Sequence, residues 1–472
     1  YCKASCLSHL LEYADQQGIY TQPEVATIFS PQPIETSHMA RVAELIDGAT
    51  ETVDIAMYSY SSRDPIRGAL QRARERGVVI RFLANTDLAK NEQKCAPLEE
   101  MGIDVRRVTK IMHHKYAIID GPRTDETLER GMNAWVATGS ANWSSSAATR
   151  YDENTVFFRG YPELTLRMQH EFDVLWAGSK DIVYEDLSWD TTRAETIKDH
   201  FAAYESQNHH VVFTSANFSP TASSGWSNLG TTTVTDVLVE AIGRAQQSLK
   251  IATGHFVSLP LAKAVANAVA ARPELQVDVV LDCQETSKGG DIGDLKSAIE
   301  SAGGRISYKC NTYRWHYKYA QQMHHKYLIV DGAQLYTGSL NFSDNAESNT
   351  FENMFMFQGK EHAALIASFE DNFAMVNEYG HADDFAALDQ LKTDIAGGDQ
   401  VPLTWYAPIT MSLGTFDELK SLIRSECPAT QSWSGTGPAN TYNKYFTQNP
   451  NWFETCHKTG YPWPEVPEEM RL

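Results

Sequence analysis

Apolar and polar positions follow two different periods along the first third of the chain. Residues 36–47 carry apolar side chains three or four positions apart, which predicts an amphipathic helix with Thr36 or Ser37 as its N-cap. Val53, Ile55 and Met57 alternate with their neighbours, which predicts a strand. A further helix between Asp64-Pro65 and Gly77 is followed by predicted strands at 78–84, 103–108 and 115–120.

The same order of elements returns in the second half of the chain. Predicted helices and strands alternate there as helix 233–245, strand 249–253, a helix from about 258, strand 277–281, helix 291–302 and strand 305–310. Each half then closes with a similar helix, at 162–176 and at 361–375. Strands that alternate with helices of this length predict α/β layers.

A duplicated motif lies within these two halves. Residues 113–121 read HHKYAIIDG and residues 324–332 read HHKYLIVDG. Each copy is followed by a Gly-Ser-x-Asn segment and then by a Glu-Asn pair; the residues concerned are Ser140, Asn142 and Glu153, and Ser339, Asn341 and Glu352. A polar insertion at 122–133 occurs only in the first half, and we expect it to be a surface loop. Whether it gates a site is not decided by its sequence.

These patterns predict two pseudo-symmetric α/β lobes, each a mixed β-sheet flanked by helices. The first lobe is assigned to 25–205 and the second to 206–396, after an N-terminal segment at 1–24. Residues 397–472 belong to neither repeat and are rich in Trp, Tyr, Pro and Gly, so we expect an irregular C-terminal extension. It is interpreted as a structural wrap over the lobes or as a cover over the mouth of the site.

Composition narrows the class of protein. The chain has 472 residues, of which 42% are hydrophobic and 21% charged, as in globular proteins. We expect a soluble protein, since no apolar run reaches the length of a membrane span. The formal net charge of -20 disfavours a long nucleic acid as partner, because nucleic-acid binders usually present basic faces.

Seven cysteines without a C-x-x-C pair argue against a zinc cluster and suggest two or three disulfides. The pairs considered are Cys427–Cys456 and Cys283–Cys310. Together with a first residue that is Tyr rather than Met, they predict a secreted or periplasmic protein. Buried free thiols in a cytosolic protein are the alternative.

The duplicated motif collects groups suited to phosphate. On a strand, His113 and Lys115 point to one face, whereas Asp120 and the neighbouring His114 point to the other. Lys is a compact charge that suits phosphate, and the Ser and Asn that follow supply neutral donors. We expect His114 and its counterpart His325 to form structural hydrogen bonds.

Glu153 and Glu352 are predicted to orient the catalytic imidazoles. Each would accept the Nδ1 proton of the histidine in its own half and leave Nε2 free for chemistry. Two halves related by a pseudo-twofold axis would bring both histidines to one phosphate. One histidine would attack phosphorus while the other protonates the leaving alcohol and later activates water, so that no metal and no cofactor is required.

The doubled H-x-K-x4-D and G-S-x-N motifs resemble those of the phospholipase D superfamily, over roughly residues 25–375. The resemblance implies a bilobal α/β fold with the active site at the lobe interface. It implies catalytic roles for the two motif triplets and phosphate binding by the residues after them; these are His113, Lys115, Asp120, His324, Lys326 and Asp331, and Ser140, Asn142, Ser339 and Asn341. In relatives the first-half histidine is often the nucleophile, which favours His113.

The motif leaves the substrate open. The first expectation is hydrolysis of phospholipids to phosphatidic acid and free headgroup alcohol, with transphosphatidylation, by a monomer at a membrane or micelle surface. A nuclease or other phosphodiesterase acting on nucleic acid is the alternative, and a non-catalytic phosphate- or lipid-binding protein is the second. The aromatic and basic stretch 312–319 is interpreted either as a rim for the substrate or as a structural strand.

Overall fold

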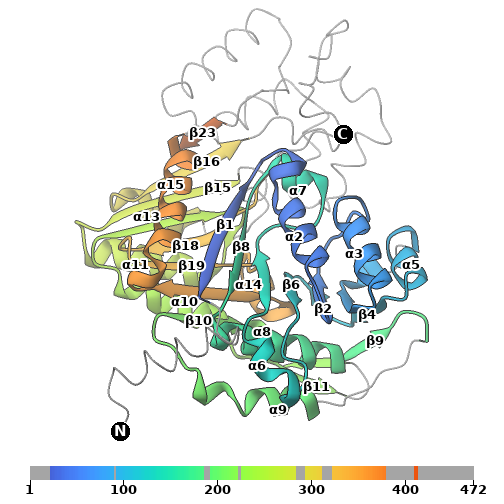
Figure 1. The fold of residues 1–472 in the computed structure, drawn as a ribbon. Coiled ribbons are helices and arrows are strands. Elements are labelled where there is room, and N and C mark those ends of the chain that lie inside the picture. The colour runs from blue at the N-terminus through green and yellow to red at the C-terminus, as the bar shows by residue number, and fades with distance from the viewer. Residues whose placement is uncertain are drawn as a thin grey trace, which may run out of the picture.

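The structure is a computed structural model that describes residues 22–89, 92–184, 192–221, 225–282, 293–310, 322–378 and 409–412. Two large mixed sheets dominate it (Figure 1). The first has the order β1-β8-β7-β6-β2-β3-β4-β9. Its strands are β1 (Glu24–Ser30), β2 (Thr52–Met57), β3 (Val79–Ala84), β4 (Asp104–Val108), β6 (Lys115–Ile119), β7 (Trp135–Gly139), β8 (Tyr151–Arg159) and β9 (Ser179–Asp181).

The second sheet repeats the first strand by strand, in the order β10-β22-β19-β18-β13-β15-β16-β23. Its strands are β10 (His209–Phe213), β13 (Ser248–Thr253), β15 (Gln276–Asp282), β16 (Arg305–Cys310), β18 (Lys326–Val330), β19 (Gln334–Gly338), β22 (Asn353–Gln358) and β23 (Ile409–Ser412). The predicted α/β architecture of two related lobes is confirmed. The lobe boundary between residues 205 and 206 stays a prediction, although it falls between the last strand of one sheet and the first of the other.

Helices cover both sheets and also lie between them. One core cluster joins the first sheet to α2 (His38–Asp47), α3 (Ile66–Glu75) and α5 (Glu92–Glu100). A second joins the other sheet to α10 (Thr233–Arg244), α11 (Leu259–Ala271) and α13 (Gly293–Ser301). A third cluster contains residues of both sheets together with α8 (Pro162–Ala177) and α15 (Ala363–Glu378). The two lobes therefore share one continuous apolar core.

The shorter elements complete the described part of the chain. They are the 3-10 turns η1 (Ile34–Thr36), η2 (Asp125–Thr127), η3 (Phe201–Ala203), η4 (Thr214–Asn217) and η6 (Lys360–His362), the helices α4 (Thr86–Ala89), α6 (Leu128–Gly131), α7 (Ser145–Thr149), α9 (Thr192–Lys198) and α14 (Asp344–Asn349), and the short strands β11 (Phe218–Thr221), β12 (Gly225–Asn228), β14 (Phe256–Val257) and β20 (Phe342–Ser343). Ser37 is the N-cap of α2, as one of the two predicted caps, and its hydroxyl accepts from the Met39 amide at 3.2 Å.

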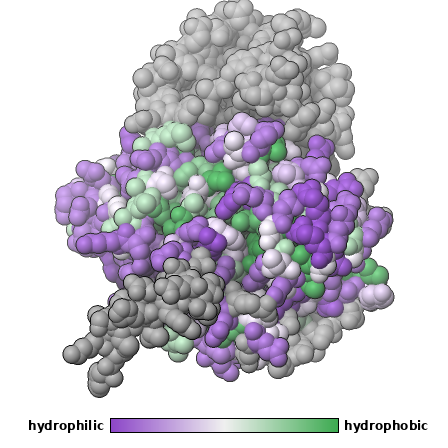
Figure 2. All heavy atoms as spheres, in the orientation of Figure 1, coloured by the Kyte–Doolittle hydropathy of each residue, from purple (hydrophilic) through white to green (hydrophobic). Residues whose placement is uncertain are grey.

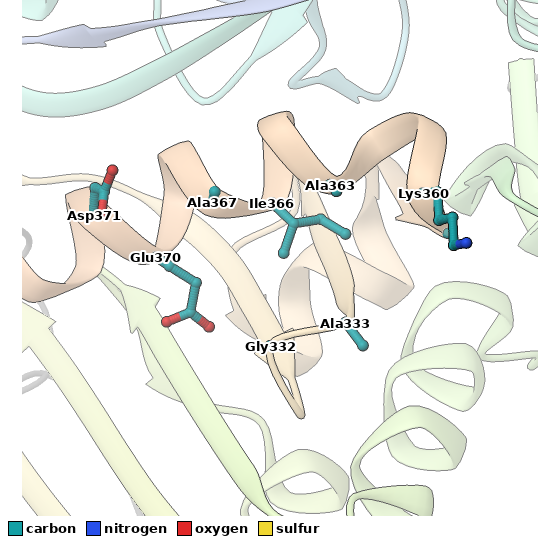
Figure 3. A pocket seen from close by; sticks show the side chains of 9 residues that line it. Gly332, Ala333, Lys360, Ala363, Ile366, Ala367, Glu370 and Asp371 are labelled. Atoms are coloured by element: carbon teal, nitrogen blue, oxygen red, sulfur yellow. The ribbon is translucent and has the colours of Figure 1, made fainter.

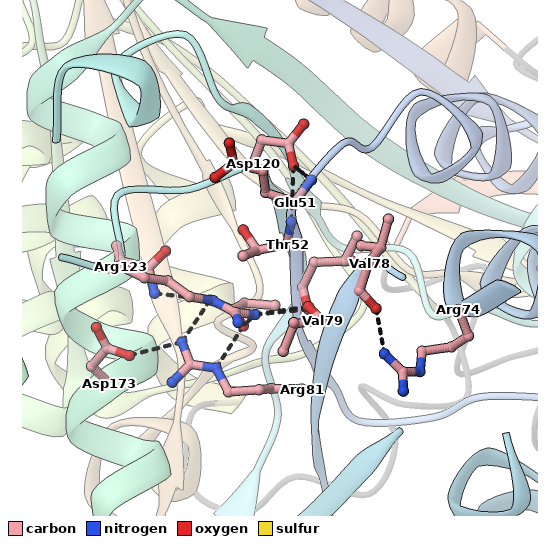
Figure 4. A network of polar contacts seen from close by, with 12 residues as sticks. Glu51, Thr52, Arg74, Val78, Val79, Arg81, Asp120, Arg123 and Asp173 are labelled. Atoms are coloured by element: carbon pink, nitrogen blue, oxygen red, sulfur yellow. Dashed lines mark hydrogen bonds and ion pairs between the residues drawn. The ribbon is translucent and has the colours of Figure 1, made fainter. Parts of the chain in front are cut away.

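The insertion at 122–133 is only partly a surface loop, which corrects the prediction. It forms η2 and α6, and Arg123 at its start is buried. Arg123 and Arg81 both bind the Asp54 carboxylate on β2, and Arg81 also binds Asp173 of α8 at 2.9 Å (Figure 4). Burial alone would raise the pKa of Asp54, but the two guanidinium groups more than offset it and hold that pKa below its usual range. The apolar core excludes water here, so Arg123 anchors the insertion through charge pairing.

Two short strands cross from one lobe to the other. β5 (Ile111–Met112) pairs in parallel with β21 (Thr350–Phe351), and β17 (Gln322–Met323) pairs in parallel with β8. Each crossing strand directly precedes one of the duplicated histidine motifs. The start of each motif is therefore fixed beside the glutamate of the other half, because Glu153 lies on β8 and Glu352 directly follows β21.

Three further sequence expectations concern the periphery. Residues 409–412 of the predicted irregular extension form β23, which pairs antiparallel with the edge strand β16. Cys95 is a buried free thiol, and the side chains of the proposed pairs Cys427–Cys456 and Cys283–Cys310 lie outside the described part. The stretch 312–319 also lies outside it.

The described surface is largely polar on the face drawn in Figure 2, with hydrophobic residues in small separate groups. Among the described helices, none combines the length and the apolar character that crossing a membrane requires.

Candidate active site at the lobe interface

The two motif histidines are held by backbone bonds that run between the lobes. The His113 amide donates to the Phe351 carbonyl at 3.0 Å, and the His324 amide donates to the Asp152 carbonyl at 2.9 Å. Each acceptor immediately precedes a motif glutamate. Each motif histidine is thus bonded to the chain beside the glutamate of the other half, so the structure brings the two copies together at the lobe interface.

Each histidine is paired with the glutamate of the other half, which corrects the prediction of pairing within a half. His113 Nδ1 lies 2.8 and 2.9 Å from the two carboxylate oxygens of Glu352, and His324 Nδ1 lies 2.8 Å from Oε1 of Glu153. The cause is the strand crossing, because β21 and β8 deliver each glutamate beside the opposite motif. With Nδ1 engaged, Nε2 of each imidazole is left to face a substrate.

The motif lysines are buried beside these pairs. Lys115 Nζ donates to the His113 carbonyl at 2.6 Å, and Lys326 Nζ donates to the His324 carbonyl at 2.7 Å. Burial lowers the pKa of Lys115 to about 7 and that of Lys326 to about 8. Burial, aided by these two cations, also lowers the pKa of both histidines. A bound phosphate would place negative charge beside these two lysines and favour their protonated forms.

The two glutamates differ in their surroundings. Burial raises the pKa of Glu153 to about 8 and that of Glu352 to about 7. Glu352 accepts hydrogen bonds from Ser339 at 2.6 Å and from Thr350 at 2.9 Å, whereas Oε2 of Glu153 is buried without a hydrogen-bond partner. The two hydroxyl groups therefore fix the orientation of the Glu352 carboxylate.

The hydroxyl groups of the motif serines are hydrogen-bonded to other protein groups and are not free donors to phosphate, which corrects their predicted role. Ser339 is fully buried; its hydroxyl donates to Glu352 and accepts from the Asn353 amide at 3.0 Å. Ser140 is also fully buried, and its hydroxyl accepts from the Asn154 amide at 2.9 Å. Ser339 thus positions Glu352, and through it His113.

The motif asparagines remain candidates for phosphate binding. Asn142 and Asn341 are half-buried, and the side-chain oxygen of each is buried without a hydrogen-bond partner. A carboxamide oxygen only accepts hydrogen bonds, so a donor such as water or a substrate hydroxyl would complete these two groups, and the Nδ2 group of each amide is the part that can donate to a phosphate oxygen.

The motif aspartates lie away from the chemistry, which corrects their assignment as catalytic residues. Asp120 is seven residues beyond His113, on the order of 20 Å along an extended strand. Its carboxylate accepts from the amides of Thr50, Glu51 and Thr52 at 2.7 to 3.2 Å (Figure 4). Asp331 binds the amides of residues 246–248 in the same way. Both aspartates fasten the turn that leads into the central strand of their sheet.

Replacing Asp120 by Asn is therefore expected to lower stability and leave the chemistry of the folded protein unchanged. Weakening several charge-assisted hydrogen bonds to backbone amides should cost about 1–3 kcal/mol of unfolding free energy. Urea unfolding and kcat per folded molecule measure the two effects separately, with Asp331→Asn as the matched variant. A large fall in kcat at unchanged stability would restore a catalytic role for these aspartates.

His114 and His325 form structural hydrogen bonds, as predicted. His114 is fully buried, its Nε2 lies 3.0 Å from Glu171 and its Nδ1 lies 3.0 Å from the side-chain nitrogen of Asn353. His325 Nδ1 lies 3.2 Å from the side-chain nitrogen of Asn154. The contacts with Asn353 and Asn154 join the two halves, so the second histidine of each motif supports the lobe interface.

Tyr58 is a site residue that the sequence analysis missed. Its ring centroid lies 4.5 Å from that of His113, and Lys115 Nζ lies 5.0 Å from the Tyr58 ring. The equivalent position after β13 is Gly254, where a Cβ would come within 2.9 Å of the Met323 carbonyl. Aligning the two repeats at the residue after β2 and after β13 would have shown that one half has a tyrosine where the other has a glycine. The two halves of the site are therefore unequal around their histidines.

A hollow of about 480 Å³ lies elsewhere, between α15 and the β18–β19 turn (Figure 3). Its lining includes Ala333, Ile366 and Glu370, and it touches the second motif only at that motif's last residue, Gly332. It is therefore separate from the histidine site.

Comparison with known proteins agrees with the duplicated site. The family model described as "Cardiolipin synthase, PLD-like domain" matches residues 42–176 and 238–376, which are the two repeats. The chain belongs to this family, within the phospholipase D superfamily. The structure of phosphatidylserine synthase from Haemophilus influenzae matches with a TM-score of 0.50 at 12% identity, over 90% of this chain and 99% of that one, and has the same fold.

Curated relatives match over single segments. The mitochondrial cardiolipin hydrolase of Drosophila melanogaster is 29% identical over 150 residues, 29% of this chain and 58% of that protein. The phospholipase D of Rickettsia conorii is 30% identical over 141 residues, 29% of this chain and 62% of that protein. The chain thus spans about six tenths of the length of these relatives.

The expected secreted or periplasmic location is contradicted by these comparisons. Relatives from Drosophila melanogaster, Chlamydomonas reinhardtii and Danio rerio are all named mitochondrial cardiolipin hydrolases. The expectation rested on cysteine number and on the first residue, and neither reports on the site of action. The buried free thiol of Cys95 shows that at least this cysteine follows the alternative reading.

Proposed function

We propose that this chain is a phosphodiesterase that hydrolyses phospholipids to phosphatidic acid and a headgroup alcohol through a covalent phospho-histidine intermediate. The observation that carries the proposal is the pair of motif histidines, each with Nδ1 on a buried glutamate of the opposite half. Two imidazoles oriented toward one site can divide nucleophilic and acid–base work between them.

His113 is proposed as the nucleophile. Its partner Glu352 is held by two hydroxyl groups, those of Ser339 and Thr350. An ionised, fixed carboxylate stabilises the positive charge that forms on the imidazole as Nε2 bonds to phosphorus. Lys115 and the Nδ2 groups of Asn142 and Asn341 supply donors to the phosphate oxygens.

His324 is proposed as the general acid and then the general base. Burial lowers the pKa of His324 in the free site, and the negative charge of a bound phosphate favours its protonated form. His324 then gives its Nε2 proton to the departing alcohol oxygen, and the phosphorus remains bonded to His113. Neutral His324 then takes a proton from water, whose oxygen attacks phosphorus and releases His113. An alcohol in place of water gives headgroup exchange by the same steps.

The lipid substrate is supported by the relatives' names, which include cardiolipin hydrolase and phospholipase D. A net charge of -20 disfavours long nucleic acid, which usually binds to basic faces. Among the basic groups before the first motif, Lys110 lies 3.3 Å from Asn349 and over the Phe218 ring. Lys110 precedes His113 by three residues, and we propose that its charge attracts an anionic headgroup.

The test is a parallel assay on vesicles of phosphatidylcholine, vesicles of cardiolipin, and single- and double-stranded DNA, with and without EDTA. We expect release of phosphatidic acid from at least one lipid, no DNA cleavage and no inhibition during a short exposure to chelator. DNA cleavage without lipid hydrolysis would replace the proposal by the nuclease alternative. Loss of activity on brief chelation would show that a metal takes part in the chemistry.

A further inference from the structure

Three side chains of the kinds that bind metal ions, two histidines and a glutamate, lie together outside the catalytic site. His209 begins β10, while Glu361 and His362 lie in η6, just before α15. His209 Nδ1 lies 3.1 Å from His362 Nε2 and 3.3 Å from Glu361 Oε1, and His362 Nε2 lies 3.3 Å from the same oxygen. We propose that these three residues form a binding site for a zinc ion or a similar divalent transition metal.

The distances are those of a tetrahedral face. Zinc binds imidazole nitrogen and carboxylate oxygen at about 2.0–2.1 Å, so two ligand atoms at the tetrahedral angle lie about 3.3 Å apart. All three separations in the cluster fall at 3.1 to 3.3 Å. Two histidines and one carboxylate are also a donor set that zinc accepts, with a fourth position left for water.

The fold brings the ligands together although they are far apart in the sequence. β10 pairs antiparallel with β22 so that His209 lies opposite Phe357, two residues before Gly359. Gly359 has a φ of 82°, and a Cβ there would lie 2.9 Å from the Asn208 side chain. This turn returns the chain directly over the start of β10, and η6 then presents Glu361 and His362 to His209.

The surroundings fix the two imidazoles and leave an open side. His362 is fully buried and His209 is 8% exposed, with the Tyr161 ring centroid 5.1 Å from His209 and 5.3 Å from His362. The side chain of Glu361 is 45% exposed, so an ion can enter from solvent on that side. Rings held in place by aromatic packing lose little entropy on binding a metal.

A direct hydrogen-bonded triad accounts for the cluster less well. A proton on only one of the two facing nitrogens can join His209 and His362. The Glu361 oxygen then lies 3.3 Å from both nitrogens, at the long end of such bonds. One cation among the three groups would satisfy all of them at once.

A metal here would fasten the start of the second lobe to the helix between the sheets. β10 is the first strand of that lobe, and α15 contributes Phe369 and Phe373 to the core shared by both sheets. The ion would act on stability rather than on the phosphodiester, because none of its ligands belongs to the histidine motifs.

The experiment measures zinc bound by the whole chain after metal removal, reloading with zinc and gel filtration. His209→Ala and His362→Ala test the cluster, Glu361→Gln removes the exposed ligand with least risk to folding, and His210→Gln is the matched control one residue away. We expect zinc affinity to fall at least about tenfold in the three cluster variants and to stay unchanged in the control. Added zinc should raise the melting temperature of the unaltered protein and of the control.

His113→Ala separates this site from the catalytic histidines, because its zinc content should match that of the unaltered protein. Cobalt in place of zinc should give the visible absorption of a tetrahedral site, and Glu361→Gln should change that spectrum. No zinc uptake by the unaltered protein would overturn the proposal. Equal uptake and affinity in Glu361→Gln and His362→Ala would overturn it as well.

Discussion

Replacing His324 by Ala is expected to stop hydrolysis of an ordinary phospholipid while sparing the first step on an ester of p-nitrophenol. Loss of a general acid should lower the rate on the ordinary substrate by about 10²–10⁴-fold. A p-nitrophenolate leaving group needs no proton, so the burst of phospho-enzyme formation should persist. His113→Ala lacks the attacking nitrogen and should lose activity on both substrates.

Burst kinetics with the two substrates and trapping of the phospho-enzyme measure these effects. His200→Ala, in a histidine outside the site, is the control and should match the unaltered protein. A persistent burst in His113→Ala, with loss in His324→Ala, would exchange the roles of the two histidines. Near-normal turnover in either variant on the ordinary phospholipid would contradict a shared site.

Replacing Glu153 or Glu352 by Gln is expected to reproduce the defect of the histidine in the opposite half. Glu153→Gln should resemble His324→Ala, with a defect that p-nitrophenol rescues, because Glu153 lies 2.8 Å from His324 Nδ1. Glu352→Gln should resemble His113→Ala and gain nothing from the better leaving group. Each loss should reach about 10²-fold or more, since an orienting carboxylate fixes the tautomer and stabilises the imidazolium.

The double variants provide the control for these assignments. Adding Glu153→Gln to His324→Ala should lower the rate of hydrolysis little more than His324→Ala alone, because the effects of residues that act as a unit are not additive. Glu153 and His113 are not partners, so the effects of Glu153→Gln and His113→Ala on the free energy of unfolding should simply add. The reverse pattern of rescue would mean that each glutamate serves the histidine of its own half in solution.

The sequence was sufficient for the elements and the duplication, whereas the catalytic and phosphate-binding roles of the motif residues stay predictions. Periodicity and caps placed α2, α3 and α10 within a few residues, since amphipathic faces and capping hydroxyls act locally. It was not sufficient for the pairing of His113 with Glu352. A repeat shows which residues are equivalent, whereas the neighbours of a residue depend on the pairing of β5 with β21, a contact across more than 200 residues.

Other misses have the same long-range origin. Asp120 was grouped with the catalytic residues because it belongs to the motif, yet its partners are the amides of 50–52, about 70 residues earlier. Arg123 was assigned to a polar surface loop because its neighbours in sequence are polar. Its partner Asp54 lies on the otherwise apolar strand β2, and the sequence does not show that the two residues meet. His209 lies about 150 residues before Glu361 and His362, so no short motif marks the cluster. Only the β10–β22 register brings the three residues together.

The exchange of glutamates between the halves constrains how such a chain can vary. Each repeat encodes a histidine and a glutamate that bind partners in the other repeat. A single copy of one repeat therefore contains both residue types but cannot form a histidine–glutamate pair within itself. Cutting the chain between β9 and β10 would yield two fragments that are separately inert and complementary when mixed. Substitutions on β8 must accordingly be tolerated by the second motif, and those on β21 by the first, so covariation in relatives should link opposite repeats.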